Sequence, residues 1–297
     1  MTTVSLGGSA PASFGRFRNA IEVFDIIPGT RQLTIPNGWS RIRVAVVGAG
    51  AGTRVRRVSN GTHGDCGGSG GGGYAEKIID VVPGQNFTYT VGQYGDLNAD
   101  GGTSSFGGLI SATGGKTATD ITDAVSQGGD GGIGIGGDIN TAGGRGGNGF
   151  DASGGGAGGG GACGHRYGAG GNGGHGAASG LGGSGGGWGG SANGTTPGPS
   201  LNRALLFDDG FGLGITAFDP PITSQLNSSS LYGRVGEGGT GSTSRISPNL
   251  GAGAGASLLT GTTVGSRNAF LGGGAAGGNA SAAGYGGVGA VIVEVLG

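Results

Sequence analysis

The sequence predicts an all-β protein, in which a small β-sheet or sandwich carries a packed bundle of glycine-rich polyproline II helices. Three observations favour this fold class: glycine makes up 84 of 297 residues, apolar segments with strand-like alternation lie near both ends, and glycines recur in local triplets. Strands are expected within about 22–115 and 288–296, and the bundle with its loop insertions within 116–287. Together these form one glycine-rich domain, 22–297, preceded by a short N-terminal docking tail, 1–21.

The strongest strand signal lies in residues 31–50. Ile42, Val44 and Val46 alternate there with arginine and alanine, which is the period of two expected of a strand. The run 291–296 is mostly β-branched and predicts a final strand. We expect this strand to close a sheet with the early strands, so that the two ends of the domain are held together.

Two further strand pairs are predicted from turn chemistry. Residues 74–95 are expected to form a strand, a turn and a second strand, because Pro83-Gly84 suits the central positions of a type II turn. Residues 104–115 are expected to form a short strand pair.

Glycine triplets predict how the middle of the chain packs. Examples begin at Gly128, Gly143 and Gly171. A spacing of three is the period of a polyproline II helix, whose N–H and C=O groups need partners outside the helix. Glycine lets neighbouring backbones supply them, at a separation of about 5 Å, as between paired strands. Collagen would need unbroken Gly-X-Y register and more than nine prolines, and a flexible linker would not divide the strands of one sheet.

Several segments poorer in glycine are predicted to be loops on this scaffold, where binding residues are commonly found. They are 53–66, 116–127, 195–232 and 240–249. The segment 195–232 is the longest and carries four aromatic residues.

A family resemblance rests on motifs in a fixed order. The chain contains "IPNGWSRIRVAVVGAGAG", then "GGGGYAEKIIDVVPGQNFTYTVGQYG", "GGTSSFGGLISATGG" and finally "GYGGVGAVIVEV". Over residues 22–294 this resembles the glycine-rich domain of bacteriophage tail and tail-fibre proteins. It is also similar in character to the adhesins that cap the long tail fibres of T-even-like phages, where stacked polyproline II helices present variable loops.

The resemblance implies a non-enzymatic virion protein of a tail fibre or tail tip, synthesised in the host cytoplasm, that presents loops for host-surface recognition. Expected partners are other tail or virion proteins, through residues 1–21, and a host receptor that is a saccharide or an outer-membrane protein. No cofactor is expected. Tail fibres are commonly homotrimers and capping adhesins can be single copies, so the subunit number stays open. The alternatives are a purely structural virion component, such as a baseplate, neck or capsid decoration protein, and a bacterial cell-wall protein.

Candidate receptor-binding residues are the aromatic residues of the glycine-rich region and one arginine run. They are Tyr167, Trp188, Phe207, Phe211, Phe218, Tyr232, Arg54, Arg56 and Arg57. Aromatic residues also fill the ends of a packed structure, and an arginine run is more often a solvated strand edge that blocks aggregation. Both structural alternatives remain open.

Four residues offer the ligand types of a tetrahedral zinc site. They are His63, Cys66, Cys163 and His165. A disulfide between Cys66 and Cys163 and two unpaired thiols are the alternatives, and we favour unpaired thiols because short Cys/His spacings arise by chance.

Enzymatic and nucleotide-binding signals are weak. Gly48 and Gly50 match the start of a dinucleotide fingerprint, but Thr53 stands at its third glycine and no helix pattern follows. The acidic residues Asp208, Asp209 and Asp219 suit loops and turns better than a glycosidase acid/base pair.

Composition limits the partners. Charged residues make up 11% of the chain and the formal net charge is −1, which argues against nucleic-acid binding. No apolar run approaches the ~20 residues of a membrane span, so no membrane insertion is expected, and the start of the chain predicts no secretory signal.

Overall fold

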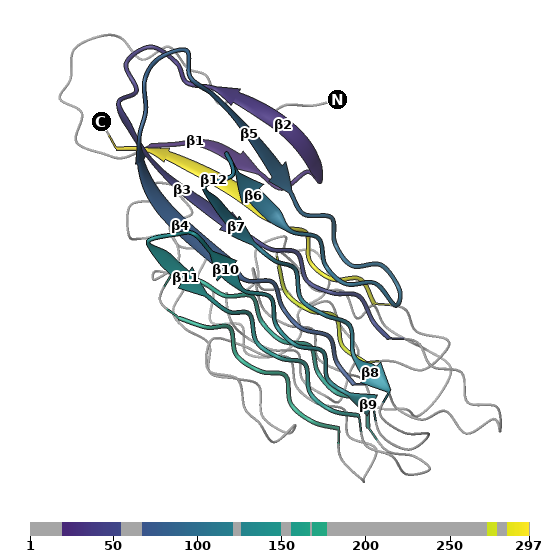
Figure 1. Ribbon diagram of the computed structural model, residues 1–297. Coiled ribbons are helices and arrows are strands. Elements are labelled where there is room, and N and C mark those ends of the chain that lie inside the picture. The colour runs from purple at the N-terminus through teal and green to yellow at the C-terminus, as the bar shows by residue number, and fades with distance from the viewer. Residues whose placement is uncertain are drawn as a thin grey trace, which may run out of the picture.

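The computed structural model describes residues 20–54, 67–120, 126–149, 156–166, 168–176, 272–277 and 284–296. These residues are all-β and contain no helix, which confirms the all-β class predicted from the sequence (Figure 1). Accordingly, no helix long and apolar enough to cross a membrane occurs among them. Of the predicted docking tail, 1–19 lie outside these ranges.

The strands form two five-stranded sheets and one two-stranded ribbon, and all pairs are antiparallel. The first sheet has the order β1 (Ala20–Asp25), β12 (Ala290–Val295), β3 (Arg41–Val47), β4 (Tyr74–Asp80) and β11 (Ile139–Thr141). The second has the order β10 (Gly134–Ile135), β7 (Ile110–Ala112), β6 (Ser104–Phe106), β5 (Asn86–Val91) and β2 (Gly29–Thr34). The ribbon pairs β8 (Thr119–Asp120) with β9 (Ser126–Gln127).

The last strand closes the first sheet, as predicted. β12 lies between β1 and β3 and pairs with both, so that Val293 stands opposite Val23 on one side and Val44 on the other. Two segments from opposite ends of the chain, β1 and β12, are thereby fixed side by side, with β1 at the edge of the first sheet (Figure 1).

The turn at Pro83-Gly84 is also confirmed. Gly84 has a φ of 82°, and the Gln85 N–H donates to the Val82 carbonyl at 3.1 Å, the geometry of a type II turn. The strands on either side, β4 and β5, belong to different sheets, so this turn links the two sheets. The predicted strand pair in 104–115 is confirmed as β6 and β7.

The two sheets share one hydrophobic core. Alternate residues of β3, Ile42, Val44 and Val46, are buried against Phe87 and Phe106 of the second sheet. The rings of Phe87 and Phe106 stack with their centroids 5.0 Å apart. The other face of β3 is buried as well, since Ala45 and Val47 belong to a second apolar cluster.

Four short strands, β8 to β11, lie between residues 119 and 141, where the sequence predicted only bundle and loops. Each has two or three residues. Strands this short leave no alternation of apolar and polar residues to detect.

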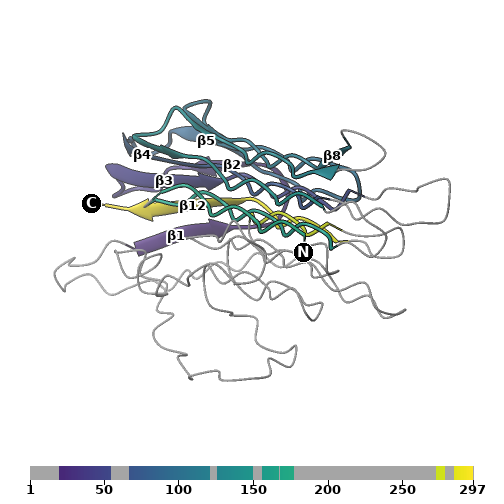
Figure 2. The same ribbon diagram turned by 90° about the horizontal axis from the view of Figure 1, so that it is seen from below.

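Between and beyond the strands, glycine-rich segments are joined laterally by backbone hydrogen bonds. In Figures 1 and 2 they continue from the strand ends and run side by side. We call these segments the glycine lattice; they are 48–53, 67–73, 92–103, 113–118, 128–133, 142–149, 156–164, 168–176, 272–277 and 284–289.

The partners within the glycine lattice rotate with a period of three. The six N–H groups of 48–53 donate in turn to 67–73, 92–103 and 284–289, and then repeat the cycle, with N–O distances of 2.8 to 3.2 Å. The N–H groups of 68–73 behave alike: they donate in rotation to 142–149, 272–277 and 113–118. Each of these two segments is therefore bonded on three sides.

Close approach of backbones explains why the lattice needs glycine. A Cβ built on Gly50 would lie 1.7 Å from the carbonyl oxygen of Gly273, and one on Gly176 would lie 1.6 Å from that of Gly156. Real Cβ contacts essentially never fall below 3.0 Å. At these two positions a side chain of any size would thus occupy the space of the neighbouring backbone.

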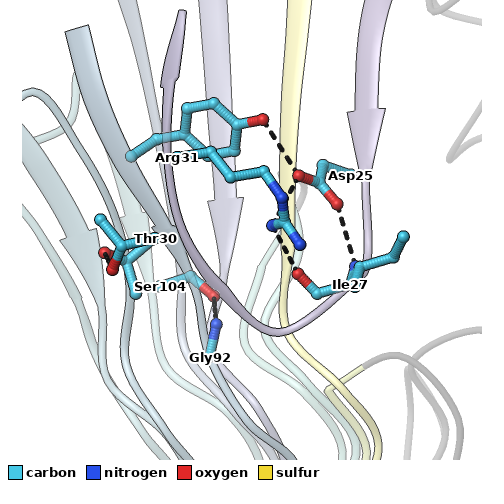
Figure 3. A network of polar contacts seen from close by, with 8 residues as sticks. Asp25, Ile27, Thr30, Arg31, Gly92 and Ser104 are labelled. Atoms are coloured by element: carbon cyan, nitrogen blue, oxygen red, sulfur yellow. Dashed lines mark hydrogen bonds and ion pairs between the residues drawn. The ribbon is translucent and has the colours of Figure 1, made fainter. Parts of the chain in front are cut away.

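A polar network joins the two sheets at the edge formed by β1 and β2 (Figure 3). The Asp25 carboxylate accepts hydrogen bonds from the Ile27 N–H at 3.0 Å, from Arg31 at 2.9 Å and from the Tyr89 hydroxyl at 3.0 Å. Burial, followed by the bond to Asp25, raises the pKa of Tyr89 to about 12. Asp25 therefore ties β1 to β2 and to β5.

Candidate functional site

Most candidate receptor-binding residues predicted from the sequence lie outside the described residues. Those outside are Arg56, Arg57, Tyr167, Trp188, Phe207, Phe211, Phe218 and Tyr232, as are the two candidate zinc ligands His63 and Cys66. Arg54 is described: it follows the lattice segment 48–53 and is half-buried. These candidates remain predictions.

Cys163 has the environment of an apolar core residue. It is a buried free cysteine in the cluster that contains Val47, Tyr74 and Ile292. Burial raises the pKa of its thiol to about 12, whereas a metal ligand must be a thiolate. Within the described ranges, no group of three or more His, Cys, Asp and Glu residues could hold a metal ion. The zinc site itself stays a prediction, because its other cysteine, Cys66, lies outside these ranges.

His165 is held in a tight turn beside Cys163. The side chain of His165 is buried. Its backbone N–H donates to the Gly168 carbonyl at 3.1 Å, and its backbone carbonyl accepts from the Thr141 hydroxyl at 2.9 Å. Burial disfavours the charged imidazolium and lowers the pKa of His165 to about 4.

The free energy of unfolding is expected to fall as the pH is lowered from about 6.5 towards 4. Unfolded histidine takes up a proton below about pH 6.5, whereas folded His165 stays neutral down to about pH 4. The contribution of neutral, buried His165 to the free energy of unfolding is therefore complete above about pH 6.5 and is lost as the pH falls to about 4. Urea unfolding of the protein and of His165→Gln across this range measures it: the variant should show a flatter dependence, and parallel curves would contradict the assignment.

A buried cluster of charges lies on the face of the first sheet that points away from the shared core. Glu294 is fully buried. Its carboxylate accepts a hydrogen bond at 2.7 Å from Arg43, the residue opposite it on β3. Glu76 accepts from the Tyr74 hydroxyl at 2.6 Å and from Arg166 at 2.9 Å, and its carboxylate lies 3.6 Å from Arg43. We call these five residues the ion cluster.

The ion cluster joins distant parts of the chain. Arg166 follows the lattice segment 156–164, so its bond to Glu76 fastens that segment to β4. Guanidinium groups bind both carboxylates, Arg43 that of Glu294 and Arg166 that of Glu76, so the ion cluster can hold the lattice segment against the sheet. Sequence reasoning missed it, although a glutamate inside the β-branched run 291–296 and an arginine inside the alternation of 31–50 were available signals.

An exposed aromatic pair lies on the lattice itself. Segments 92–103 and 284–289 are neighbours, because the N–H of Gly286 donates to the Gly95 carbonyl at 3.0 Å. This brings Tyr94 and Tyr285 together, with ring centroids 5.8 Å apart and planes at 81°. Tyr285 keeps 40% of its surface exposed and Tyr94 is half-buried.

A polar turn follows Tyr94 directly. Asn98 has a φ of 57°, in the left-handed region that few non-glycine residues adopt, and its N–H donates to the Thr53 carbonyl at 2.9 Å. The Asp96 carboxylate accepts from the Leu97 N–H at 2.7 Å. Asp96 and Asn98 are exposed. We call Tyr94, Asp96, Asn98 and Tyr285 the tyrosine patch.

The tyrosine patch is a functional candidate that sequence reasoning missed. Its members come from two segments far apart in the sequence, and only the lateral pairing of the lattice brings the two rings together. Comparisons with known proteins add no assignment, since no family model and no curated protein matches the chain.

Proposed function

We propose that the protein is a non-enzymatic virion protein of a phage tail fibre or tail tip, and that its rigid lattice presents loops to the host surface. The observation that carries the proposal is the rotation of lattice hydrogen bonds among three neighbours. A polyproline II helix has three residues per turn, so packed helices of this type would produce the same rotation. Such a bundle is what the resemblance to tail-fibre proteins implies.

A rigid support suits adhesion. Loops carried by a lattice with backbone bonds on three sides lose less conformational entropy on binding than loops on a flexible chain. The predicted loops 53–66 and 195–232, with the aromatic and arginine candidates in them, would then contact the receptor. Residues 1–21 would attach the protein to the rest of the tail.

Cosedimentation of the purified, fluorescently labelled protein with a panel of bacterial strains tests this proposal. We expect saturable binding to some strains, and weaker binding after deletion of 195–232. Unchanged binding by the deletion variant would remove that loop from the site. Failure of the full-length protein to bind any strain would contradict receptor binding and favour a purely structural virion component.

A further inference from the structure

We propose that the tyrosine patch binds a neutral saccharide of the host surface. The inference rests on the proposed function and names the ligand chemistry of one site. Its starting point is the unusual exposure of aromatic surface on a lattice built mainly of glycine. Neither ring belongs to either buried apolar cluster of the described residues, and Tyr285 remains 40% exposed.

The patch combines the two kinds of group that a sugar ring needs. Tyrosine rings offer a flat apolar surface with a polar edge, against which the C–H face of a pyranose can pack. Because the two ring planes stand at 81°, a sugar could pack against the face of one ring and contact the other ring from the side. Asp96 and Asn98, exposed on the turn that follows Tyr94, supply carboxylate and amide groups for the sugar hydroxyls.

Charge favours a neutral ligand. Of the four patch residues only Asp96 carries a formal charge, and its carboxylate would repel phosphate or carboxylate groups on a saccharide. The half-buried Arg54, which follows Thr53, lies outside the patch as defined. The nearby acidic residue Asp100 is neutralised by Lys116, whose ammonium group lies 2.9 Å from it. An acidic polysaccharide should therefore bind more weakly than a neutral one.

The patch is preformed by the backbone around it. Gly95, between Tyr94 and Asp96, donates its N–H to the Gly50 carbonyl at 2.9 Å, and Asn98 donates to Thr53 at 2.9 Å. The same segment, 48–53, also donates to the Gly284 carbonyl beside Tyr285, at 2.9 Å. Both tyrosines are thus positioned through one shared neighbour, and little ordering is needed on binding.

Binding of the full-length protein to an array of immobilised neutral and acidic bacterial polysaccharides tests the inference. We expect binding to neutral polysaccharides, reduced about tenfold or more by Tyr285→Ala and largely retained by Tyr285→Phe, which keeps the ring. Phe24→Ala is the matched control, because Phe24 on β1 is an aromatic residue of similar exposure, 41%. Asp96→Asn keeps an acceptor for the Leu97 N–H and should raise binding to the acidic polysaccharides.

Three outcomes would overturn the inference: no polysaccharide binding by the unmodified protein, equal binding by Tyr285→Ala, or a change in subunit number on Tyr285→Ala in sedimentation velocity. The last outcome would make the patch a contact between copies of the chain. Cell binding separates the two proposals. Equal binding of the unmodified protein and of Tyr285→Ala to the same strains would contradict the patch alone, whereas failure of both proteins to bind any strain of the panel would contradict the proposed function.

Discussion

Gly50→Ala is expected to lower the free energy of unfolding by about 3 kcal/mol or more, an effect at the upper end for overpacking. The added Cβ would lie 1.7 Å from the Gly273 carbonyl oxygen and 2.4 Å from its carbonyl carbon. Neither is the end of a flexible side chain, so two lattice segments must separate. Their separation would also strain the hydrogen bond that joins them, from the Ala275 N–H to the Ala51 carbonyl at 3.0 Å. Urea unfolding followed by circular dichroism measures the change.

Gly168→Ala is the matched control. Gly168 also lies in the glycine lattice, but a Cβ there would meet only a His165 ring carbon, at an ordinary 3.8 Å. This variant should unfold within about 0.5 kcal/mol of the unmodified protein, as expected of substitutions that disturb no contact. Hydrogen exchange gives a second measurement, since Gly50→Ala should expose the amides of 48–53 to exchange. Equal stability of the two variants would show that backbone contact is not what holds the lattice together.

The parts of the fold that could be predicted are those with a local signal. The alternation of Ile42, Val44 and Val46, the Pro83-Gly84 turn and the β-branched final strand are each visible within a few residues. Which strand belongs to which of the two sheets could not be predicted from these local signals. The type II turn fits a hairpin as well as a link between sheets, and only the pairing of β4 with β3 and of β5 with β2 distinguishes them.

The candidate sites show the same division between local and distant information. The sequence around Cys163 did not show that this residue is buried in an apolar cluster, because the other members of the cluster come from distant strands. Tyr94 and Tyr285 meet only because their backbones pair laterally. Side-chain patterns normally indicate which segments of a chain pack together, and a glycine-rich sequence has few side chains to form such patterns. The neighbours within the lattice therefore could not be predicted.

Glu76→Ala is expected to lower the free energy of unfolding by about 3–5 kcal/mol, the usual cost of removing one partner from a buried ion pair. Glu76 is 3% exposed, and its loss would leave the Tyr74 hydroxyl and the Arg166 guanidinium without the carboxylate that they now contact at 2.6 and 2.9 Å. Segment 156–164 would lose its ionic attachment to β4, so its amides should also exchange faster. Urea unfolding and hydrogen exchange measure the two effects.

A control on the same strand separates burial from charge. Asp80, at the end of β4, pairs with Arg41 at 3.1 Å, but both side chains are largely exposed, at 79% and 57%. Asp80→Ala should therefore cost less than about 1 kcal/mol, because water screens exposed ion pairs. Glu76→Gln, which keeps two polar atoms but removes the charge, should fall between the two alanine variants. If Glu76→Ala and Asp80→Ala destabilise the protein equally, the ion cluster does not clamp the lattice to the sheet, and residues 156–166 must be held there by backbone bonds and the apolar contacts of Cys163.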